Sequence, residues 1–230
     1  MHIAYFGISN EIEELVNQCE EEVDILYKEI EKLALYNQSK VLKAFQEQKV
    51  AQAHFGKTTG YGYDDLGRDA IEKIFSKIYN TEDALVRVQF VSGTHTIATV
   101  LQALLMPGDT LLAISGKPYD TLCNVIGIVE SPLSLKNYGV KYEQIDLLNK
   151  ASFDIPKIIE YITKNKVKLV HIQRSRGYEI RKALYISDIK EVIEEIKKID
   201  KDIIVMVDNC YGEFTETLEP TDVGADIAVR

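Results

Sequence analysis

The chain has 230 residues, of which 46% are hydrophobic and 27% are charged. This length suits one large domain or a domain with an appendage, and the composition excludes a disordered chain because a sizeable core can form. The formal net charge of −9 disfavours nucleic acid and anionic membranes as partners, and no run approaches the roughly 18 apolar residues of a membrane-spanning helix.

The sequence also indicates the cellular compartment and whether a metal site is expected. The N-terminus lacks the basic region and the long apolar run of a signal peptide. The three cysteines (Cys19, Cys123 and Cys210) are an odd number and lie far apart, so reduced thiols are expected. These features predict a cytoplasmic protein. The four histidines are scattered without metal-ligand spacing, so no metal site is predicted.

The first predicted element is helical. Residues 11–50 contain neither Pro nor Gly, and their apolar residues recur at helical spacing. We expect either one long helix or two long helices separated near Asn37, in an N-terminal helical segment over residues 1–55. The apolar positions that carry this prediction are Ile12, Leu15, Val16, Cys19, Val23, Leu26, Ile30 and Leu33.

A glycine-rich loop follows at residues 56–67, with four glycines and the tyrosines Tyr61 and Tyr63. Loops on rigid scaffolds often carry function. Tyrosine is enriched at interfaces, so this loop is predicted to lie at a subunit boundary. Alternatively it closes over its own subunit's site as a lid, with Gly60 and Gly62 as hinges. A helix with one apolar face is predicted from Leu66 to Ile78.

From Ala84 onward, predicted strands alternate with predicted helices. This order implies βαβ units and an α/β fold with a mostly parallel sheet. Asp154 and Ser187 are predicted to cap the third and fourth of these helices. The strands are expected at 84–92, 110–115, 140–147, 167–173, 203–208 and 225–229, and the helices at 95–105, 118–127, 154–165 and 187–200.

The strand at 203–208 ends in an acid, Asp208, and the chain is organised around it. In open α/β sheets, ligands bind just past the carboxyl ends of the strands. A carboxylate there needs a partner, because isolated burial of a charge costs several kcal/mol or more. A pyridinium nitrogen, a metal ion, ribose hydroxyls and a helix N-terminus are the partners that fit.

Other strand ends also carry polar or aromatic side chains. Ser92, Gly93 and Thr94 stand where a helix begins, so they would present N–H groups and a hydroxyl to an anion, although such residues are common in ordinary turns too. No dinucleotide-binding or P-loop glycine pattern is present. Tyr119 follows a strand and would stack on a flat ligand or serve as a core tyrosine.

Two arginines, Arg174 and Arg176, follow the strand at 167–173. Arginine is the preferred fork for carboxylate or phosphate, and a surface or interface ion pair is the alternative. An anion seat, a stacking ring, basic groups and a carboxylate thus all fall at strand ends. Together they match pyridoxal 5'-phosphate, whose pyridinium nitrogen needs an Asp.

Four motifs carry a family resemblance: SGTHT at 92–96, PYDTL at 118–122, QRSRGY at 173–178 and VDNCYGEF at 207–214. With TTGYGYDDLGRDAIE upstream, the chain resembles the fold-type I pyridoxal-phosphate proteins of the aluminium-resistance or methionine gamma-lyase-like family, relatives of the cystathionine lyases. The resemblance runs from about residue 10 to the end. It implies the three-layer large domain of such enzymes, here over residues 56–230.

The resemblance also implies roles for particular residues. Ser92, Gly93 and Thr94 match the turn that binds the cofactor phosphate. Tyr119 matches the aromatic residue that stacks on the cofactor ring, and Asp208 matches the partner of the ring nitrogen.

Two further matches rest on position. Ser175 and Arg176 fall where relatives touch the phenolic oxygen of the cofactor. Tyr61 or Tyr63 matches a tyrosine that reaches the cofactor of the neighbouring subunit, in a homodimer or homotetramer. The arginine that accompanies this tyrosine is replaced here by Asp64 or Asp65.

One family feature is missing from this sequence. The Schiff-base lysine follows the aspartate strand in relatives, whereas the last lysine here is Lys201, before Asp208. The small C-terminal domain is missing too. The resemblance implies a carbon–sulfur lyase acting on a small sulfur-containing amino acid, by cystathionine beta-lyase or methionine gamma-lyase-like elimination. The alternatives are an aminotransferase or racemase of the same fold, or a non-catalytic scaffold that lacks the lysine.

Overall fold

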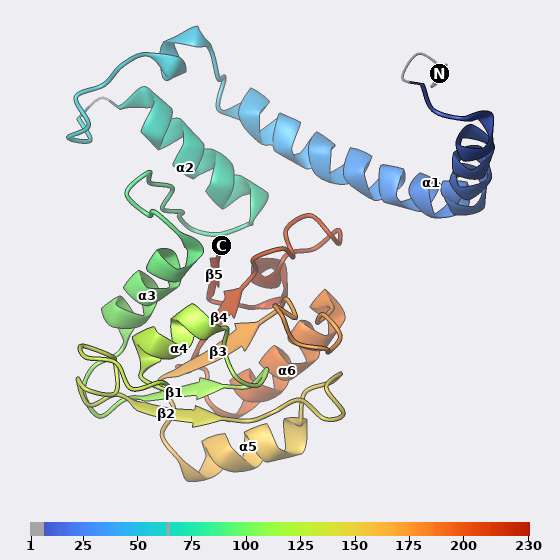
Figure 1. Cartoon of the computed structure of the whole chain (residues 1–230). Coiled ribbons are helices and arrows are strands. Elements are labelled where there is room, and N and C mark those ends of the chain that lie inside the picture. Colours follow the sequence, from blue (N-terminus) through green and yellow to red (C-terminus); the bar gives the residue numbers. More distant parts are fainter. Residues whose placement is uncertain (1–6, 64) are drawn as a thin grey trace.

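The structure is a computed structural model that describes residues 7–63 and 65–230. Its centre is a five-stranded, wholly parallel sheet with the order β2-β1-β3-β4-β5 (Figure 1). The strands are β1 (Thr110–Ala113), β2 (Lys141–Gln144), β3 (Leu169–Gln173), β4 (Ile204–Asp208) and β5 (Ile227–Val229). The alternation of strands and helices in the sequence therefore predicts the fold class correctly.

Helices cover both faces of this sheet and make it the middle of three layers (Figure 1). The helices α3 (Gly93–Leu104) and α4 (Asp120–Ile126) pack on one face, against Leu111, Leu169 and Met206. The helices α5 (Ile155–Lys164) and α6 (Ile186–Ile199) pack on the other, against Leu112, Val170 and Val205. Because successive strand residues point to opposite faces, the continuous apolar runs of β1, β3 and β4 fill both cores.

The strand expected at 84–92 is not formed. Val86 N–H donates to the Glu72 carboxylate at 3.0 Å, and a turn closes where Phe90 N–H donates to Arg87 C=O at 3.1 Å. A strand needs a hydrogen-bonded neighbour, and within residues 7–63 and 65–230 the sheet ends at β5, with a cavity between β5 and this segment. The apolar sequence is typical of a strand, but no described strand lies beside it to form backbone hydrogen bonds.

The predicted helix caps have mixed outcomes. Asp154 caps α5, since its carboxylate accepts from Lys157 N–H at 3.2 Å. The prediction that Ser187 caps α6 is wrong, because α6 begins at Ile186 and Tyr185 is its N-cap. The Asp188 carboxylate accepts from Tyr185 N–H at 3.1 Å, and this bond fixes the helix start earlier in the chain.

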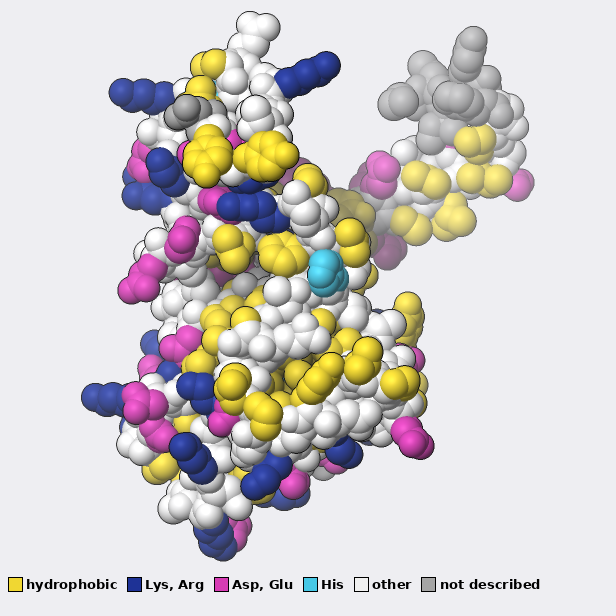
Figure 2. All heavy atoms as spheres, turned by 90° about the vertical axis from the view of Figure 1, so that its left-hand side faces the viewer, with side chains coloured by type: hydrophobic (Ala, Val, Ile, Leu, Met, Phe, Trp, Pro, Cys, Tyr) yellow, Lys and Arg dark blue, Asp and Glu magenta, His cyan; other side chains and the backbone are white. Residues whose placement is uncertain are grey.

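Among its described residues, the N-terminal segment contains one long helix, α1 (Asn10–Glu47), and α1 continues through Asn37 without a break. Asn37 is buried, and its amide nitrogen donates to the carbonyls of Phe214 and Glu216 at 3.0 and 3.1 Å. The polar residue therefore joins the helix to the body instead of interrupting it. Beyond this contact α1 projects away from the body, with hydrophobic side chains exposed (Figures 1 and 2).

The short helix η2 (Gln52–Phe55) and the glycine-rich loop connect α1 to α2 (Leu66–Ile78). Asp65 is the N-cap of α2 and accepts from Arg68 N–H at 3.3 Å, while Asp64 lies outside the described residues. The buried face of α2 includes Ile74 and Ile78, which pack with Ala44 of α1. A second short helix, η3 (Pro220–Val223), precedes β5. Among the described helices, none is both long and apolar enough to cross a bilayer.

Candidate active site

The carboxylate of Asp208 ends β4 at the centre of the site. Only 3% of this residue is exposed, and Cys210 N–H donates to its Oδ1 at 3.1 Å. Burial raises the pKa of Asp208 above its usual range, and the bonds from Cys210 oppose that shift. No Lys, Arg or His of the described chain forms an ion pair with it. The site therefore holds a buried acid that a cationic ligand would stabilise.

Tyr119 connects the loop after β1 to the start of α3. Its hydroxyl donates to Thr94 Oγ1 at 3.0 Å, and Thr94 Oγ1 lies 2.7 Å from Thr121 Oγ1. Its backbone N–H donates to Gln173 Oε1 at 2.9 Å. Burial raises the pKa of Tyr119, and the charge of Asp208 raises it further, so the hydroxyl stays protonated and can donate. The ring is thus held in place from both ends, near Asp208.

The first turn of α3 offers an anion seat. Ser92 is the N-cap, and its Oγ accepts from His95 N–H at 3.1 Å, which leaves the hydroxyl hydrogen free to donate. The N–H groups that begin a helix have no partner inside it and, with the helix dipole, favour an anion. A Cβ added at Gly93 would lie 3.6 Å from Cys210 Sγ. The seat therefore adjoins the turn that follows Asp208.

The two arginines in the loop after β3 have different surroundings. Arg174 is 3% exposed and donates to Asn209 Oδ1 at 2.8 Å, to Gly212 C=O at 2.7 Å and to the Glu216 carboxylate at 2.7 Å. Its guanidinium is therefore occupied by hydrogen bonds to the loop that follows Asp208. The side chain of Arg176 is exposed to solvent. Of the two, Arg176 is therefore the one available to a ligand.

Ser175 is positioned through its backbone. Its carbonyl accepts from Gln173 Nε2 at 3.2 Å and from the guanidinium of Arg181, which is itself buried. Gln173 is directly beside Asp208 in the sheet register. Gln173 thus joins Tyr119, Ser175 and the strand that carries Asp208.

Sequence reasoning missed Gln173, Thr121 and Cys210. Gln173 ends β3, so the same strand-end rule that selected Asp208 could have selected it. Cys210 touches the site because the chain turns immediately after β4, and burial beside Asp208 raises the pKa of its thiol to about 12. Thr121 lies within the PYDTL motif, but only its contact with Thr94 in the structure reveals its place in the site.

Tyr61 and Tyr63 do not join this group. They stand on the loop before α2 and are 82% and 81% exposed. The structure thus brings together Ser92, Gly93, Thr94, Tyr119, Ser175 and Asp208, and leaves these two tyrosines facing solvent.

The donor set at these strand ends and at the start of α3 fits pyridoxal 5'-phosphate. A helix N-terminus with Ser92 and Thr94 suits a phosphate, the half-buried ring of Tyr119 suits an aromatic face, and the carboxylate of Asp208 suits a pyridinium N–H. Within the described ranges, no cluster of three or more His, Cys, Asp or Glu side chains could hold a metal ion.

Comparison with protein families gives one family match. Residues 12–229 match the family model described as methionine gamma-lyase. The uncharacterised protein YnbB of Bacillus subtilis is 45% identical over 212 residues, which cover 90% of this chain and 50% of YnbB.

Solved structures give the same picture. A carbon–sulfur lyase involved in aluminium resistance from Clostridium novyi NT is 43% identical with a TM-score of 0.90, over 98% of this chain and 54% of that chain. A candidate cystathionine beta-lyase involved in aluminium resistance from Listeria innocua is 48% identical with a TM-score of 0.90, over 95% and 54%. The chain thus spans about half the length of these relatives.

A more distant structure supports the fold alone. It is a candidate O-acetylhomoserine (thiol)-lyase of Campylobacter jejuni, solved with a pyridoxyl-lysine phosphate, at 18% identity and a TM-score of 0.50 over 71% of this chain and 35% of that chain.

Proposed function

The chain belongs to the methionine gamma-lyase family, and we propose that it forms part of a pyridoxal-phosphate-dependent carbon–sulfur lyase. The substrate class is a small sulfur-containing amino acid such as cystathionine or methionine. The observation that carries the proposal is the buried carboxylate of Asp208, which has no cationic partner in the described chain and lies beside a stacking ring and an anion seat.

The cofactor would be held by the first turn of α3 and by residues that follow the strands β1, β3 and β4. The first turn of α3, with Ser92, Gly93 and Thr94, would bind the phosphate. Tyr119 would pack its ring on the pyridine ring, and its bond to Thr94 would fix the distance between ring and phosphate seat. Ser175 and Arg176 would lie on the side of the phenolic oxygen.

Asp208 would hold a proton on the pyridine nitrogen. When bound, the cofactor supplies an electron sink that stabilises negative charge at the α-carbon of an amino acid. Asp208 strengthens that sink only while it is ionised and the ring nitrogen is protonated. Burial raises the free-energy cost of an unpaired Asp208 carboxylate, as its raised pKa indicates. A pyridinium would therefore stabilise the ionised carboxylate, and the carboxylate would in turn stabilise the protonated ring nitrogen.

Several parts of the proposal concern the longer polypeptide. We propose that it is a homodimer or homotetramer in the cytoplasm, with the loop at 56–67 at a subunit boundary. Incubation of the full-length polypeptide that contains this chain with pyridoxal phosphate and L-cystathionine should release a thiol, ammonia and a 2-oxo acid. L-Methionine should be tested in parallel. Transfer of the amino group to an added 2-oxo acid, without thiol release, would instead identify an aminotransferase.

A non-catalytic scaffold of the same fold is the second candidate, because residues 209–230 contain no lysine. Borohydride reduction with pyridoxal phosphate, followed by peptide mass analysis, separates the two. For a lyase we expect one stoichiometric pyridoxyl-lysine outside residues 1–230, and the 230-residue chain alone should give none. Absence of any such adduct in the full-length polypeptide would favour the scaffold.

A further inference from the structure

The turn that follows Asp208 has an unusual backbone. Two of its residues, Tyr211 and Phe214, are not glycines, yet their φ angles of 67° and 58° lie in the left-handed region. Such conformations cost free energy and persist where the surrounding structure fixes them. The same turn supplies Cys210 N–H, which donates to the Asp208 carboxylate at 3.1 Å. The contacts that hold this turn therefore also set the surroundings of Asp208.

Asn209 lies between two opposite charges at the start of the turn. It is 1% exposed, and its Oδ1 accepts from the Arg174 guanidinium at 2.8 Å. Its Nδ2 donates to Glu219 Oε2 at 2.9 Å. A guanidinium can only donate and an ionised carboxylate can only accept, so the two charged neighbours fix the orientation of the amide. The three side chains form a buried chain of hydrogen bonds that all run from the cation to the anion.

Glu219 is the fully buried end of this chain. None of its surface is exposed, and its Oε1 accepts from Phe214 N–H at 2.8 Å. In the described part of the chain, no Lys, Arg or His forms an ion pair with it. Burial of such a charge is costly unless hydrogen bonds compensate for it. The N–H groups of Asn209 and Phe214 supply that compensation, and through them Glu219 holds both ends of the turn.

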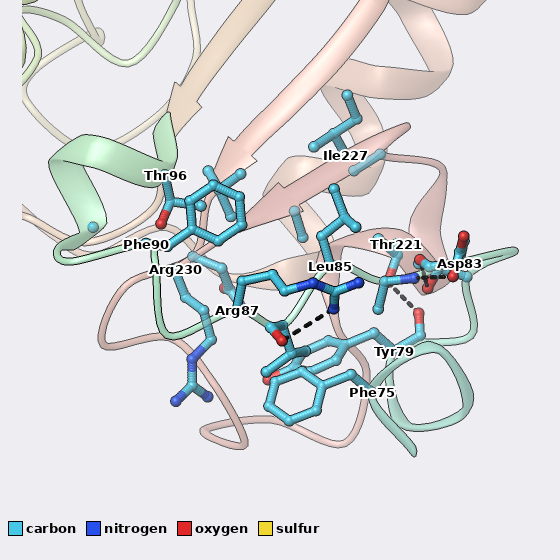
Figure 3. A pocket seen from close by; sticks show the side chains of 18 of the residues that line it. Phe75, Tyr79, Asp83, Leu85, Arg87, Phe90, Thr96, Thr221, Ile227 and Arg230 are labelled. Atoms are coloured by element: carbon cyan, nitrogen blue, oxygen red, sulfur yellow. Dashed lines mark hydrogen bonds between the residues drawn. The ribbon is translucent and has the colours of Figure 1, made fainter. Parts of the chain in front are cut away.

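The segment that carries Glu219 is anchored from outside the turn. Glu219 N–H donates to the Asp222 carboxylate at 2.9 Å, at the start of η3. The Thr221 hydroxyl donates to the C=O of Tyr79, the residue that ends α2, in the wall of the cavity beside β5 (Figure 3). These bonds place Glu219 independently of the turn, so it can serve as a fixed point for the turn.

We propose that Glu219 is a positioning residue for Asp208. It acts through Asn209 and Phe214, whose bonds to its carboxylate hold the turn in the conformation that delivers Cys210 N–H to Asp208. Without this restraint the turn would relax from its left-handed conformation, and Asp208 would lose a donor that favours its ionised form. The consequence for cofactor binding rests on the proposed function, whereas the restraint on the turn does not.

The direction of the hydrogen bonds allows a test by moving the charge. In the full-length polypeptide, Glu219→Gln leaves either Asn209 Nδ2 or Phe214 N–H facing an NH2 group instead of an oxygen, whichever way the new amide is turned. Asn209 cannot turn over to help, because Arg174 holds its Oδ1. Combining Glu219→Gln with Asn209→Asp moves the carboxylate to position 209, where Arg174 and the new amide both donate to it. The double variant thus restores every bond at the same net charge.

Hydrogen exchange of the cofactor-free polypeptide, measured by mass spectrometry on peptides that cover residues 209–214, reports on the turn. We expect Glu219→Gln to speed exchange there by about tenfold or more, while peptides from β1 and α5 exchange as in the wild type. The double variant should return exchange to within about threefold of the wild type. The matched control is Glu130→Gln, which makes the same chemical change at an exposed residue and should leave exchange unchanged.

Absorbance titration with pyridoxal phosphate is the second measurement. The Kd should rise by about threefold or more in Glu219→Gln and recover in the double variant. Faster exchange with an unchanged Kd would overturn the positioning role and leave Glu219 purely structural. Unchanged exchange in Glu219→Gln, or a double variant that does not recover, would overturn the proposal as well.

Two further outcomes are also decisive. If Glu219→Gln fails to fold, the double variant must still fold and exchange as the wild type does, or the proposal is rejected. A wild-type polypeptide that binds no pyridoxal phosphate would contradict the proposed function, and the exchange data alone would then decide whether Glu219 holds the turn beside Asp208.

Discussion

The hydroxyl of Tyr119 donates to Thr94 Oγ1 at 3.0 Å and so joins the loop after β1 to the first turn of α3. One residue offers a ring to a flat ligand and the other belongs to the anion seat. The bond fixes these two features relative to each other before any ligand arrives, and such preorganisation lowers the cost of binding.

This relationship predicts a graded loss of cofactor affinity at position 119. In the full-length polypeptide, Tyr119→Phe keeps the ring and loses one hydrogen bond, so we expect the Kd for pyridoxal phosphate to rise by less than about tenfold. Tyr119→Ala also loses the stacked ring and should raise the Kd by more than about tenfold. Absorbance titration measures both. Tyr138→Ala, at an exposed tyrosine, is the control; equal effects at positions 119 and 138 would contradict the assignment.

Asp208 predicts a pH-dependent stability. Its pKa is raised in the folded chain by burial, while an Asp in the unfolded chain titrates near pH 4. The folded state therefore holds the proton to higher pH than the unfolded state. The free energy of unfolding due to this residue is unaffected below the unfolded pKa and falls as the pH rises through the raised folded pKa.

Asp208→Asn should therefore be more stable than the wild-type chain at pH 7 without cofactor, and the difference should shrink as the pH falls toward about 4. Urea unfolding across this pH range measures the difference in stability, with Asp202→Asn, at an exposed residue, as the control.

Asp208→Asn should also lower kcat of the full-length enzyme saturated with cofactor more than it weakens cofactor binding. A variant with unchanged kcat would remove Asp208 from the mechanism.

The two arginines of the QRSRGY motif should differ sharply in their effect on stability. Arg174→Met removes the buried donor shared by Asn209, Gly212 and Glu216, although Thr215 Oγ1 still donates to Gly212 C=O and Ile186 N–H to the Glu216 carboxylate. We therefore expect a loss of about 1–3 kcal/mol of unfolding free energy. Arg176→Met, at an exposed side chain, should change stability by no more than about 0.5 kcal/mol. Urea unfolding of the chain measures both variants. Equal losses of unfolding free energy would contradict the different roles assigned to the two arginines.

The sequence predicts the five strands of the sheet and most residues of the candidate site from local patterns. Buried parallel strands read as apolar runs, and Asp208 and Tyr119 follow the strands β4 and β1, whereas Ser92 follows an apolar run that forms no strand. The pattern fails where tertiary contacts decide. Asn37 looks like a helix breaker, yet its bonds to Phe214 and Glu216 keep it within α1.

Strand formation at 84–92 fails for a related reason. The run has the right composition, but a strand exists only with a hydrogen-bonded neighbour, and composition cannot reveal whether that neighbour is present. Gln173 could have been selected by its strand-end position, but its bond to Tyr119 N–H, like the bond of Arg181 to Ser175 C=O, depends on contacts between loops. The position at a strand end reduces the number of candidate site residues, and contacts between loops then show what each of them does.

The glycine-rich loop at 56–67 is anchored at its base and open at its tip. Asp65 accepts from Thr58 Oγ1 at 3.1 Å, and Arg68 donates to the carbonyl of Gly60 at 3.4 Å. Tyr61 and Tyr63, by contrast, are 82% and 81% exposed. Two large rings left in water at the tip of this loop are what the proposed contact with a second subunit would bury.

Subunit mixing in the full-length polypeptide tests whether this loop serves the neighbour's site. One variant carries Tyr61→Ala with Tyr63→Ala, and the other carries Asp208→Ala. If the loop acts across the boundary, one site of each mixed dimer receives both defects and the other receives neither. Random exchange should then restore about a quarter of wild-type activity. If the loop acts as a lid within its own chain, every site keeps one defect and no activity returns. A fully active monomer in sedimentation would end the proposal outright.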